Sequence, residues 1–383
     1  MKQEELLAQL PNFLRPTLRL FLSVDIVGST AFKQSSKSPS AVTKLGAPWL
    51  EATTLFYNEF ERLFTTAWDA STSELKAKYS WQMGPSPDLW KAAGDELIYT
   101  KALTDHRQAF VAVQAWTTAV KGFKPALKKF SRSLDLKCTA WLAGFPVTNA
   151  EVMLRQSLSE QDKLQLPDDD SLVSNFKLLE QLGDRASSLV KDYIGPSIDT
   201  GFRLAALSTP RKFVLSLDLA LLLAHTLVTP PDTEFQVTTK FRFDGKETLK
   251  GVLEGVPYPI FWIDVDPDDK LNKAEDRLTG QDSISVSDMR EFCQVFLSEM
   301  EDKMFRPYII GNPDSFFTIV PDSHLERLKT YFDYWQNEKE KRRVEQDTSE
   351  PVAEVKPGAR ATLDLSKFVQ LLAEATRQNK PPS

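Results

Sequence analysis

Cysteine and histidine are scarce in this chain of 383 residues, which has two of the first and three of the second. Cys138 and Cys293 cannot form a disulfide framework or a cysteine-rich zinc site, and such sparse use of cysteine fits a reducing cytoplasm. His106, His225 and His324 stand far apart in the sequence without a pattern of partners, so we assign them no catalytic role.

Long apolar runs and an excess of positive charge are also absent. The most hydrophobic window, residues 213–228, contains Asp218 and His225 and is too short to span a bilayer, so no membrane helix is predicted. Residues 1–20 include acidic residues and prolines where a signal peptide needs a basic start and an unbroken apolar stretch. A net charge of -6 argues against a broad nucleic-acid-binding surface. We therefore expect a soluble, cytoplasmic protein.

Residues 1–265 contain a regular succession of apolar patterns. Residues 17–27 are apolar on both faces, as in a central strand, and residues 49–68 carry apolar side chains at helical spacing. Two short apolar runs within residues 88–100 flank a Gly-Asp pair, which predicts a hairpin. This order predicts an α+β fold, with helices packed on a mostly antiparallel sheet. The other predicted elements are a helix at 105–121 and strands at 134–145, 236–243 and 257–265.

The other segments are polar. Residues 150–185 are charged and predict a loop, and residues 266–285 are acidic, which predicts a linker or an exposed loop. Residues 266–345 form a predicted accessory region that is mainly helical, and residues 346–383 a predicted flexible tail. Within them we expect helices at 286–304 and 321–345, a possible strand at 315–321 and a short helix at 364–377.

A carboxylate, Asp25, stands near the end of the first predicted strand. A charge at the end of a buried strand is costly unless a partner neutralises it, and a hard divalent cation is one suitable partner. The hairpin supplies a second carboxylate, Asp95, on the tight turn at Gly94. Singly, Asp25 also fits a strand-end cap and Asp95 a turn residue. If the hairpin lies beside the first strand, the two carboxylates converge, which is the minimum for a two-metal site acting on a phosphate ester.

The sequences FLSVDIVGST and KAAGDE, which begin at residues 21 and 91, resemble the paired signature of the class III nucleotidyl cyclases. Three further matches follow in the order found in that family. Asp192 stands where adenylate cyclases have a base-reading aspartate, Arg203 where the family has its transition-state arginine, and Lys250 in a segment that resembles the closing Lys-Gly hairpin. The resemblance spans residues 17–265 and implies a ferredoxin-like cyclase catalytic domain.

The chemistry implied by this resemblance is the attack of a ribose 3'-hydroxyl on the α-phosphate of its own nucleoside triphosphate, with loss of pyrophosphate. Asp25, Asp95 and the backbone carbonyl of Ile26 would hold two Mn²⁺ or Mg²⁺ ions. Arg203 would stabilise the charge that develops on the α-phosphate, and Lys250 would hold the triphosphate. In these cyclases the active site lies between two chains, so a homodimer with two equivalent sites is implied.

Lys91 and Asp192 are the implied base-reading pair. A donor beside an acceptor fits adenine, uracil or cytosine, and argues against guanine. The diverged metal motif, the insert at residues 33–48 and the carboxy-terminal region look most like the pyrimidine cyclases of bacterial Pycsar antiphage systems. Tyr57 is a candidate for the bulky side chain that shortens the pocket to one ring. The predicted substrate is therefore UTP, giving cyclic UMP for a downstream effector, while ATP and CTP stay open.

One position departs from the family pattern. Asp199 replaces the asparagine found four residues before the arginine, and on a helix Asp199 and Arg203 would share a face and could pair directly. Asp199 is then a variant residue that positions the ribose or the arginine. A non-enzymatic interpretation also stays open, in which a degenerate cyclase-like domain binds a nucleotide or a partner without turnover.

Overall fold

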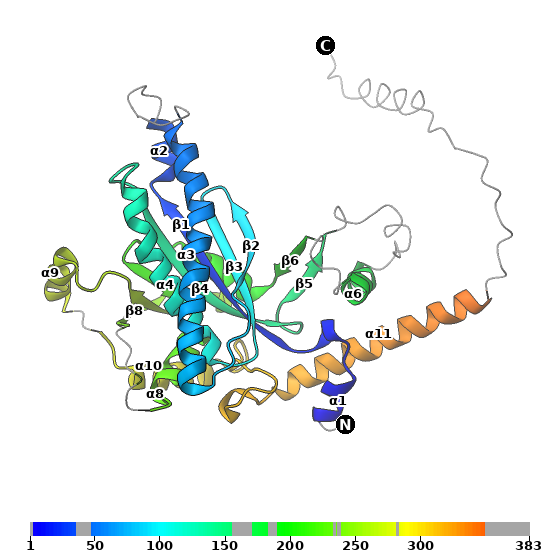
Figure 1. Ribbon diagram of the computed structural model, residues 1–383. Helices are drawn as coiled ribbons and strands as arrows, with labels where there is room; N and C mark the ends of the chain where they lie inside the picture. Colours follow the sequence, from blue (N-terminus) through cyan, green and yellow to red (C-terminus); the bar gives the residue numbers. More distant parts are fainter. Residues whose placement is uncertain are drawn as a thin grey trace, which may run out of the picture. The chain divides into compact units, whose positions relative to one another are not determined.

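The computed structural model describes residues 3–35, 47–154, 171–182, 190–232, 235, 239–280 and 283–348 (Figure 1). The chain divides after Trp335 into two compact units, and the first unit holds the sheet and every site residue proposed from the sequence. Among the described residues, no helix is both long and apolar enough to cross a membrane.

A seven-stranded sheet has its strands in the order β2-β3-β1-β4-β7-β9-β8. Every neighbouring pair is antiparallel except β4 and β7, so the predicted α+β class with a mostly antiparallel sheet is confirmed. The strands are β1 (Thr17–Val27), β2 (Asp88–Ala93), β3 (Glu96–Leu103), β4 (Asp135–Phe145), β7 (Lys212–Leu215), β8 (Phe241–Glu247) and β9 (Tyr258–Asp264).

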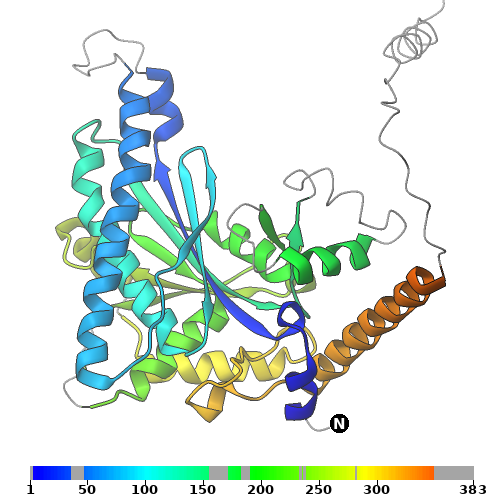
Figure 2. The ribbon, with the colours of Figure 1, turned by 45° about the vertical axis from the view of Figure 1, so that its right-hand side comes forward.

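The first four strands have a ferredoxin-like arrangement. β1 pairs antiparallel with β3 on one side and with β4 on the other. The connection from β1 to β2 contains α3 (Pro48–Tyr79), and the connection from β3 to β4 contains α4 (Arg107–Lys128). These two helices pack against each other on the same face of the sheet, as Figures 1 and 2 show. The predicted hairpin is the β2–β3 pair.

Four aromatic side chains anchor α3 in the core. Their spacing of four residues places them on one face of the helix, and each is at most 1% exposed. The helix predicted at 49–68 is confirmed and continues to Tyr79, because Leu75 and Tyr79 extend the packed face. The anchoring residues are Phe56, Phe60, Phe64 and Trp68.

Alternation along β1 separates its two faces. Leu20 and Leu22 are buried in the core that α3 and α4 share. Phe21 points to the opposite face, where it stacks on Trp141 of β4 with ring centroids 5.3 Å apart. Helix α7 (Pro196–Ala205) contributes to this second, smaller cluster. Asp25 is four residues from Phe21, and residues an even number apart on a strand share a face. Asp25 therefore belongs to the face opposite α3 and α4.

Helix α7 approaches the sheet very closely at Gly201. A Cβ added there would lie 2.3 Å from the Trp141 ring, so only glycine allows this contact. Because α7 also carries Asp199 and Arg203, the contact fixes the height of both residues above β4.

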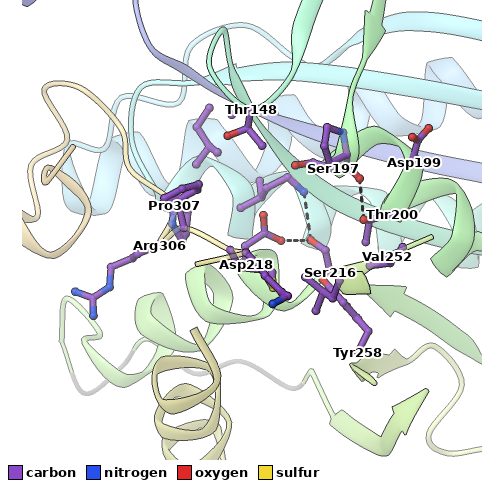
Figure 3. Close-up of a pocket in the computed structure, with 18 of the residues that line it drawn as sticks. Thr148, Ser197, Asp199, Thr200, Ser216, Asp218, Val252, Tyr258, Arg306 and Pro307 are labelled. Atoms are coloured by element: carbon purple, nitrogen blue, oxygen red, sulfur yellow. Dashed lines mark hydrogen bonds between the residues drawn. The ribbon is translucent and has the colours of Figure 1, made fainter. Parts of the chain in front are cut away.

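The most hydrophobic window, residues 213–228, becomes most of β7 and the buried helix α8 (Leu217–Val228). Between them, the Ser216 hydroxyl donates a hydrogen bond to the carboxylate of Asp218. These two residues border a cavity of about 460 Å³ that α7 also lines (Figure 3). Ser216 and Asp218 of this window therefore border a cavity.

The prediction of a loop at 150–185 is wrong for the part that the structure describes. β5 (Ala150–Met153) pairs antiparallel with β6 (Lys191–Ile194), and α6 (Ser171–Leu182) lies between these two strands in the sequence. Val173 and Phe176 of α6 are buried in a separate cluster. The charged composition concealed a helix with one apolar face. Residues 155–170 and 183–185 lie outside the described residues.

The possible strand at 315–321 is also wrong. Residues Ser315–Phe317 form the short 3-10 helix η5, whose start is capped by the Asp314 side chain accepting the Phe316 N–H at 2.9 Å. Phe317 is fully buried, so the aromatic run anchors this segment in the core. The helix predicted at 364–377 lies outside the described residues.

Two of the helices expected after residue 266 are present, and four further short elements lie in the earlier part of the chain. The helices predicted at 286–304 and 321–345 are confirmed as α10 and α11. The other elements are α1 (Gln3–Gln9), α2 (Ser29–Ser35), α10 (Val286–Glu299), α11 (Asp322–Thr348), η1 (Asn12–Leu14) and η4 (Leu253–Gly255).

The acidic stretch 266–285 is not the linker or loop that was predicted, because it contains helix α9 (Lys270–Thr279). The Asp269 side chain caps this helix by accepting the N–H groups of Leu271 and Asn272 at 2.9 and 3.0 Å. The acidic residues that suggested a linker are therefore structural.

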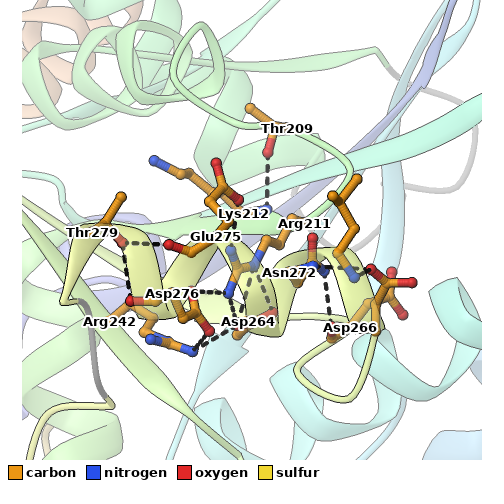
Figure 4. Close-up of polar contacts among 12 residues, drawn as sticks. Thr209, Arg211, Lys212, Arg242, Asp264, Asp266, Asn272, Glu275, Asp276 and Thr279 are labelled. Carbon is orange, nitrogen blue, oxygen red and sulfur yellow. Dashed lines mark hydrogen bonds and ion pairs between the residues drawn. The ribbon is translucent and has the colours of Figure 1, made fainter.

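Ion pairs hold α9 against the sheet (Figure 4). Arg211 lies 2.8 Å from Asp264 of β9 and 2.6 Å from Asp276 of α9. Arg242 of β8 contacts the same two carboxylates at 3.1 and 2.7 Å. The Asp264 side chain is 0% exposed and that of Arg242 6%, so this network is buried and each charge depends on its partners.

Replacing Arg242 with methionine should therefore destabilise the fold. The variant leaves the buried Asp264 carboxylate with Arg211 as its ion-pair partner in the network, and breaking a buried pair costs about 3–5 kcal/mol. Urea unfolding followed by circular dichroism measures the change. The control is Arg277→Met, which removes an exposed arginine of α9 and should change stability by less than about 0.5 kcal/mol. Equal effects of the two variants would contradict the role of the network.

Candidate active site

Asp25 lies near the end of β1, directly between two charged residues of the neighbouring strands. The register pairs it with Glu96 of β3 on one side and Lys137 of β4 on the other. Residues directly opposite in a sheet share a face, so the three side chains form one row across three strands. The Lys137 ammonium lies 3.1 Å from Asp25 Oδ2. This row is at the end of the sheet where β1 leaves the core.

Asp95 sits on the hairpin turn at the same end of the sheet. Gly94 supplies the turn with a φ of +71°, and the Ile26 N–H donates to the Asp95 carbonyl at 3.1 Å. The Ser29 hydroxyl donates to Asp95 Oδ2, and the Lys33 ammonium lies 3.7 Å from Oδ1. The hairpin turn that carries Asp95 therefore lies against the end of β1 that carries Asp25, and the charge of Asp95 acts on the Asp25 carboxyl.

Glu96 is a third carboxylate, which the sequence reasoning did not single out. Its Oε1 accepts a hydrogen bond from the Ser23 hydroxyl at 2.6 Å. Only the register shows that Glu96 faces Asp25, because the next residue along a strand points to the other face. The sequence signal was its place directly after the Gly-Asp turn.

Burial and the repulsion of neighbouring carboxylates raise the pKa values of Asp25 and Glu96. Burial is the main cause of the raised pKa of Asp25, Asp95 raises it further, and Lys137 opposes the shift. Burial also raises the pKa of Glu96, and the charges of Asp25 and Asp95 add to the effect. A cluster of carboxylates in a half-buried setting is a donor set that fits a hard divalent cation, since oxygen ligands are what Mg²⁺ and Mn²⁺ prefer.

Lys91 and Asp192 form an ion pair with Nζ and Oδ1 2.6 Å apart. Lys91 belongs to β2 and Asp192 to β6, so the fold joins two segments that are distant in the sequence. The Lys91 ammonium also lies 4.3 Å from the centre of the Trp90 ring, and the Tyr193 N–H donates to Asp192 Oδ1 at 2.9 Å. The two side chains remain 41% and 27% exposed, so both stay accessible to a ligand.

Asp199 and Arg203 are both exposed on α7. In the part of the chain that the structure describes, they form no ion pair with each other, so the direct pairing that their spacing suggested is not observed. Arg203 is free to reach a group outside its own helix.

The structure assigns different surroundings to Lys250 and Tyr57. Lys250 is exposed in the connection between β8 and β9, which pair antiparallel as a hairpin. The Tyr57 hydroxyl donates to the carbonyl of Gly94. Tyr57 therefore contacts the hairpin turn beside Asp95, which makes it a residue that positions this turn.

The histidines have partners that the sequence did not reveal. His106, at the start of α4, and His225, in α8, are buried, and each brings a ligand atom within 4.8 Å of the other and of the Asp314 carboxylate. His225 Nε2 and Asp314 Oδ2 are hydrogen-bonded at 2.8 Å. Two imidazoles and a carboxylate are a set that can hold a transition metal. In the structure, these contacts hold η5 against the start of α4 and against α8.

Comparisons with known proteins were made for the sequence and for the structure. No protein-family model and no curated protein matches the sequence. Among solved structures, the chain is similar to the adenylyl cyclase CyaB from P. aeruginosa, with 13% identity, coverage of 65% of this chain and 94% of that chain, and a TM-score of 0.39.

Two further solved structures have similar scores. The guanylyl cyclase Cya2 has 10% identity, covers 65% of this chain and 92% of its own, and gives a TM-score of 0.35. The guanylate cyclase domain of RhGC from Catenaria anguillulae, solved with GTP, has 11% identity, coverages of 65% and 97%, and a TM-score of 0.35. Similarity at this level does not transfer an activity or a substrate.

The raised pKa of Asp25 makes a prediction about stability. A carboxyl group whose pKa is higher in the folded state destabilises the fold once it ionises, so this cost is absent at acidic pH and appears as the pH rises through the carboxyl range. Asp25→Asn should therefore raise the thermal unfolding midpoint at neutral pH in metal-free buffer, and the gain should vanish at acidic pH. Added Mn²⁺ should stabilise the wild type and not the variant.

The control for this experiment is Asp88→Asn, which removes an exposed carboxylate of β2. It should change neither the midpoint nor the response to Mn²⁺. If the unfolding midpoint of Asp25→Asn at neutral pH is below that of the wild type, ionised Asp25 does not destabilise the fold and the prediction is wrong.

Proposed function

We propose that this chain is a nucleotidyl cyclase that converts a nucleoside triphosphate, UTP in the first instance, into a 3',5'-cyclic nucleotide and pyrophosphate. The observation that supports it most is the convergence of Asp25, Asp95 and Glu96 at one end of the sheet. The ion pair of Lys91 and Asp192 adds support, because the cyclase motifs that supply these residues are far apart in the sequence.

In the proposed reaction, the ribose O3' forms a bond to the α-phosphorus, the bond from that phosphorus to the bridging oxygen breaks, and pyrophosphate leaves. The hydroxyl proton passes to solvent. Two divalent cations, Mn²⁺ or Mg²⁺, would lower the pKa of the hydroxyl and neutralise phosphate charge when bound. Asp25, Asp95 and the carbonyl of Ile26 would hold them. Lys137, 3.1 Å from Asp25, helps to keep that carboxylate ionised.

The exposed residues would handle the substrate. Arg203 donates hydrogen bonds to the α-phosphate, where a single such donor is worth about 3–4 kcal/mol of transition-state stabilisation. Asp199, one turn earlier on the same helix, orients the ribose or the arginine. Lys250 pairs with the outer phosphates. Nucleophile and electrophile belong to one molecule, so holding its bent conformation lowers the barrier further.

Base selection would depend on Lys91 and Asp192. The ammonium donates to a ring acceptor and the carboxylate accepts from the neighbouring N–H, which uracil offers as a carbonyl beside N3–H. Adenine and cytosine offer the same polarity, so ATP and CTP are the alternatives. Tyr57 acts through the hairpin turn that it contacts at Gly94. The ion pair observed between Lys91 and Asp192 would open to admit the base.

The proposed enzyme is a homodimer with shared sites. Arg203 is exposed and has no partner among the described residues, as expected for a side chain whose target belongs to a second chain. We extend the proposal to the biological role that the resemblance implies, a signal in bacterial antiphage defence read by an effector that binds the cyclic nucleotide. Phage plating on cells that carry the wild type or an Asp95→Asn variant beside the effector would test that role.

The activity is tested with purified protein, Mn²⁺ and each of the four nucleoside triphosphates, with products separated by chromatography. We expect cyclic UMP from UTP, less product from CTP or ATP, and none from GTP. Asp95→Asn should remove turnover because it removes a metal-binding carboxylate, while circular dichroism stays unchanged. Absence of a cyclic product from all four substrates would overturn the proposal, and preference for ATP would overturn the choice of base alone.

The shared site is tested by mixing two inactive variants. Arg203→Ala should lower turnover about 10²- to 10³-fold, since it removes one transition-state donor. Mixed with Asp95→Asn, it should form dimers in which one of the two sites has every residue, so random mixing restores about one quarter of the wild-type rate. Recovery of no activity would show that each chain builds its own site.

A further inference from the structure

A cavity of about 460 Å³ lies away from the carboxylate cluster (Figure 3). Its walls come from α7, the start of α8, the turn at residues 251–254 and the segment 302–308. We propose that this cavity is a regulatory site that binds a small organic cation, a primary amine or an amidine with an apolar body, against Asp218.

The Asp218 carboxylate has an oxygen available for a ligand. Oδ1 accepts hydrogen bonds from the Ser216 hydroxyl and from the Leu219 N–H at 3.0 Å. The Ser216 oxygen is itself held by the Leu142 N–H at 3.3 Å. Both of these hydrogen bonds go to Oδ1, and Figure 3 shows the carboxylate among the residues that line the cavity. A ligand N–H in the cavity could therefore bind Oδ2, and a hydrogen bond to a charged group is a strong one.

The charge of the lining favours a cation. Burial raises the pKa of Asp218 to about 6, so the group is still mostly ionised at neutral pH. The Lys303 ammonium is already paired with Asp302 at 2.9 Å and with Glu254 at 3.4 Å. Arg306 extends away from the cavity in Figure 3 and lies 4.6 Å from the centre of the Phe316 ring. The negative charge of Asp218 is therefore not compensated by either basic residue.

A second polar anchor lies in the same lining. His324 is 5% exposed, and its Nδ1 is 3.0 Å from the Tyr308 hydroxyl. Its Nε2 is buried without a hydrogen-bond partner among the described residues. The cavity lining therefore contains a carboxylate and an imidazole, both from residues that the cavity borders.

The rest of the lining is apolar. Cavities of roughly 300–1,000 Å³ are typical of small-molecule sites with a few polar groups, and this volume is in that range. The apolar part explains why the proposed ligand has a hydrophobic body and is not a bare ammonium ion. The apolar lining residues include Leu18, Leu142, Phe145, Val252, Met304 and Phe305.

The cavity is joined to the proposed active site through α7. Pro196, Ser197 and Thr200 line it, and Arg203 lies one turn further along the same helix. A ligand that fills the cavity would contact α7 on one side and the segment 302–308 on the other, so it would bias the position of Arg203. This regulatory part rests on the proposed function, and the binding part does not.

Binding is tested by calorimetric titration of the full chain with benzamidine, and with benzamide as its neutral counterpart. We expect the wild type to bind benzamidine at least about tenfold more tightly than benzamide, because only the amidinium pairs with the carboxylate. Asp218→Asn should remove that difference. Asp302 lines the same cavity but is already paired with Lys303. The control variant Asp302→Asn should therefore keep the preference for benzamidine.

Two results would overturn the site: equal affinity of the wild type for benzamidine and benzamide, or unchanged preference in Asp218→Asn. The benzamide comparison on the wild type decides the matter even if the variant folds poorly. Turnover measured with and without benzamidine tests the regulatory part. A measured cyclase rate that saturating benzamidine leaves unchanged would overturn regulation, whereas a chain with no turnover at all would overturn the proposed function and leave the binding result standing.

Discussion

The structure depends on the pairing of β1 along both of its edges. Because β3 and β4 bond to it over nearly its whole length, the side chain of Asp25 is fixed directly between Glu96 and Lys137. The same ladder brings the hairpin turn, and with it Asp95, to the end of β1. Two neighbouring, half-buried carboxylates with one ammonium beside them are a costly arrangement for folding, and carboxylate oxygens are the ligands that a divalent cation needs.

Local patterns in the sequence were sufficient to predict most elements of residues 17–145. The apolar run of β1, the four-residue spacing of aromatic residues in α3 and the Gly94 turn each carry their own signal. Helix α9 and the second sheet were missed for a different reason. The acidic residues of α9 are neutralised by Arg211 and Arg242, which lie on or beside distant strands, and no window of the sequence contains both sets of charges.

The sequence predicted the candidate-site residues that belong to recognisable motifs. It did not predict those whose neighbours depend on strand register. The sequence paired Asp25 with Asp95 and Lys91 with Asp192, and the structure has both groupings. Glu96 was missed because its facing residue depends on strand register. The contacts of His106 and His225 with Asp314 were missed because they depend on how two helices and the carboxy-terminal segment pack, which periodicity alone does not specify.

The contact between Gly201 and the Trp141 indole limits which residues related sequences could carry at position 141. With no side chain between them, the thickness of one aromatic ring sets the gap between the helix backbone and the strand. The indole therefore works as a spacer of fixed size, and a thinner or thicker residue at that position would raise or lower every side chain that α7 presents. Evolution could adjust the reach of Arg203 by altering a residue that never meets the substrate.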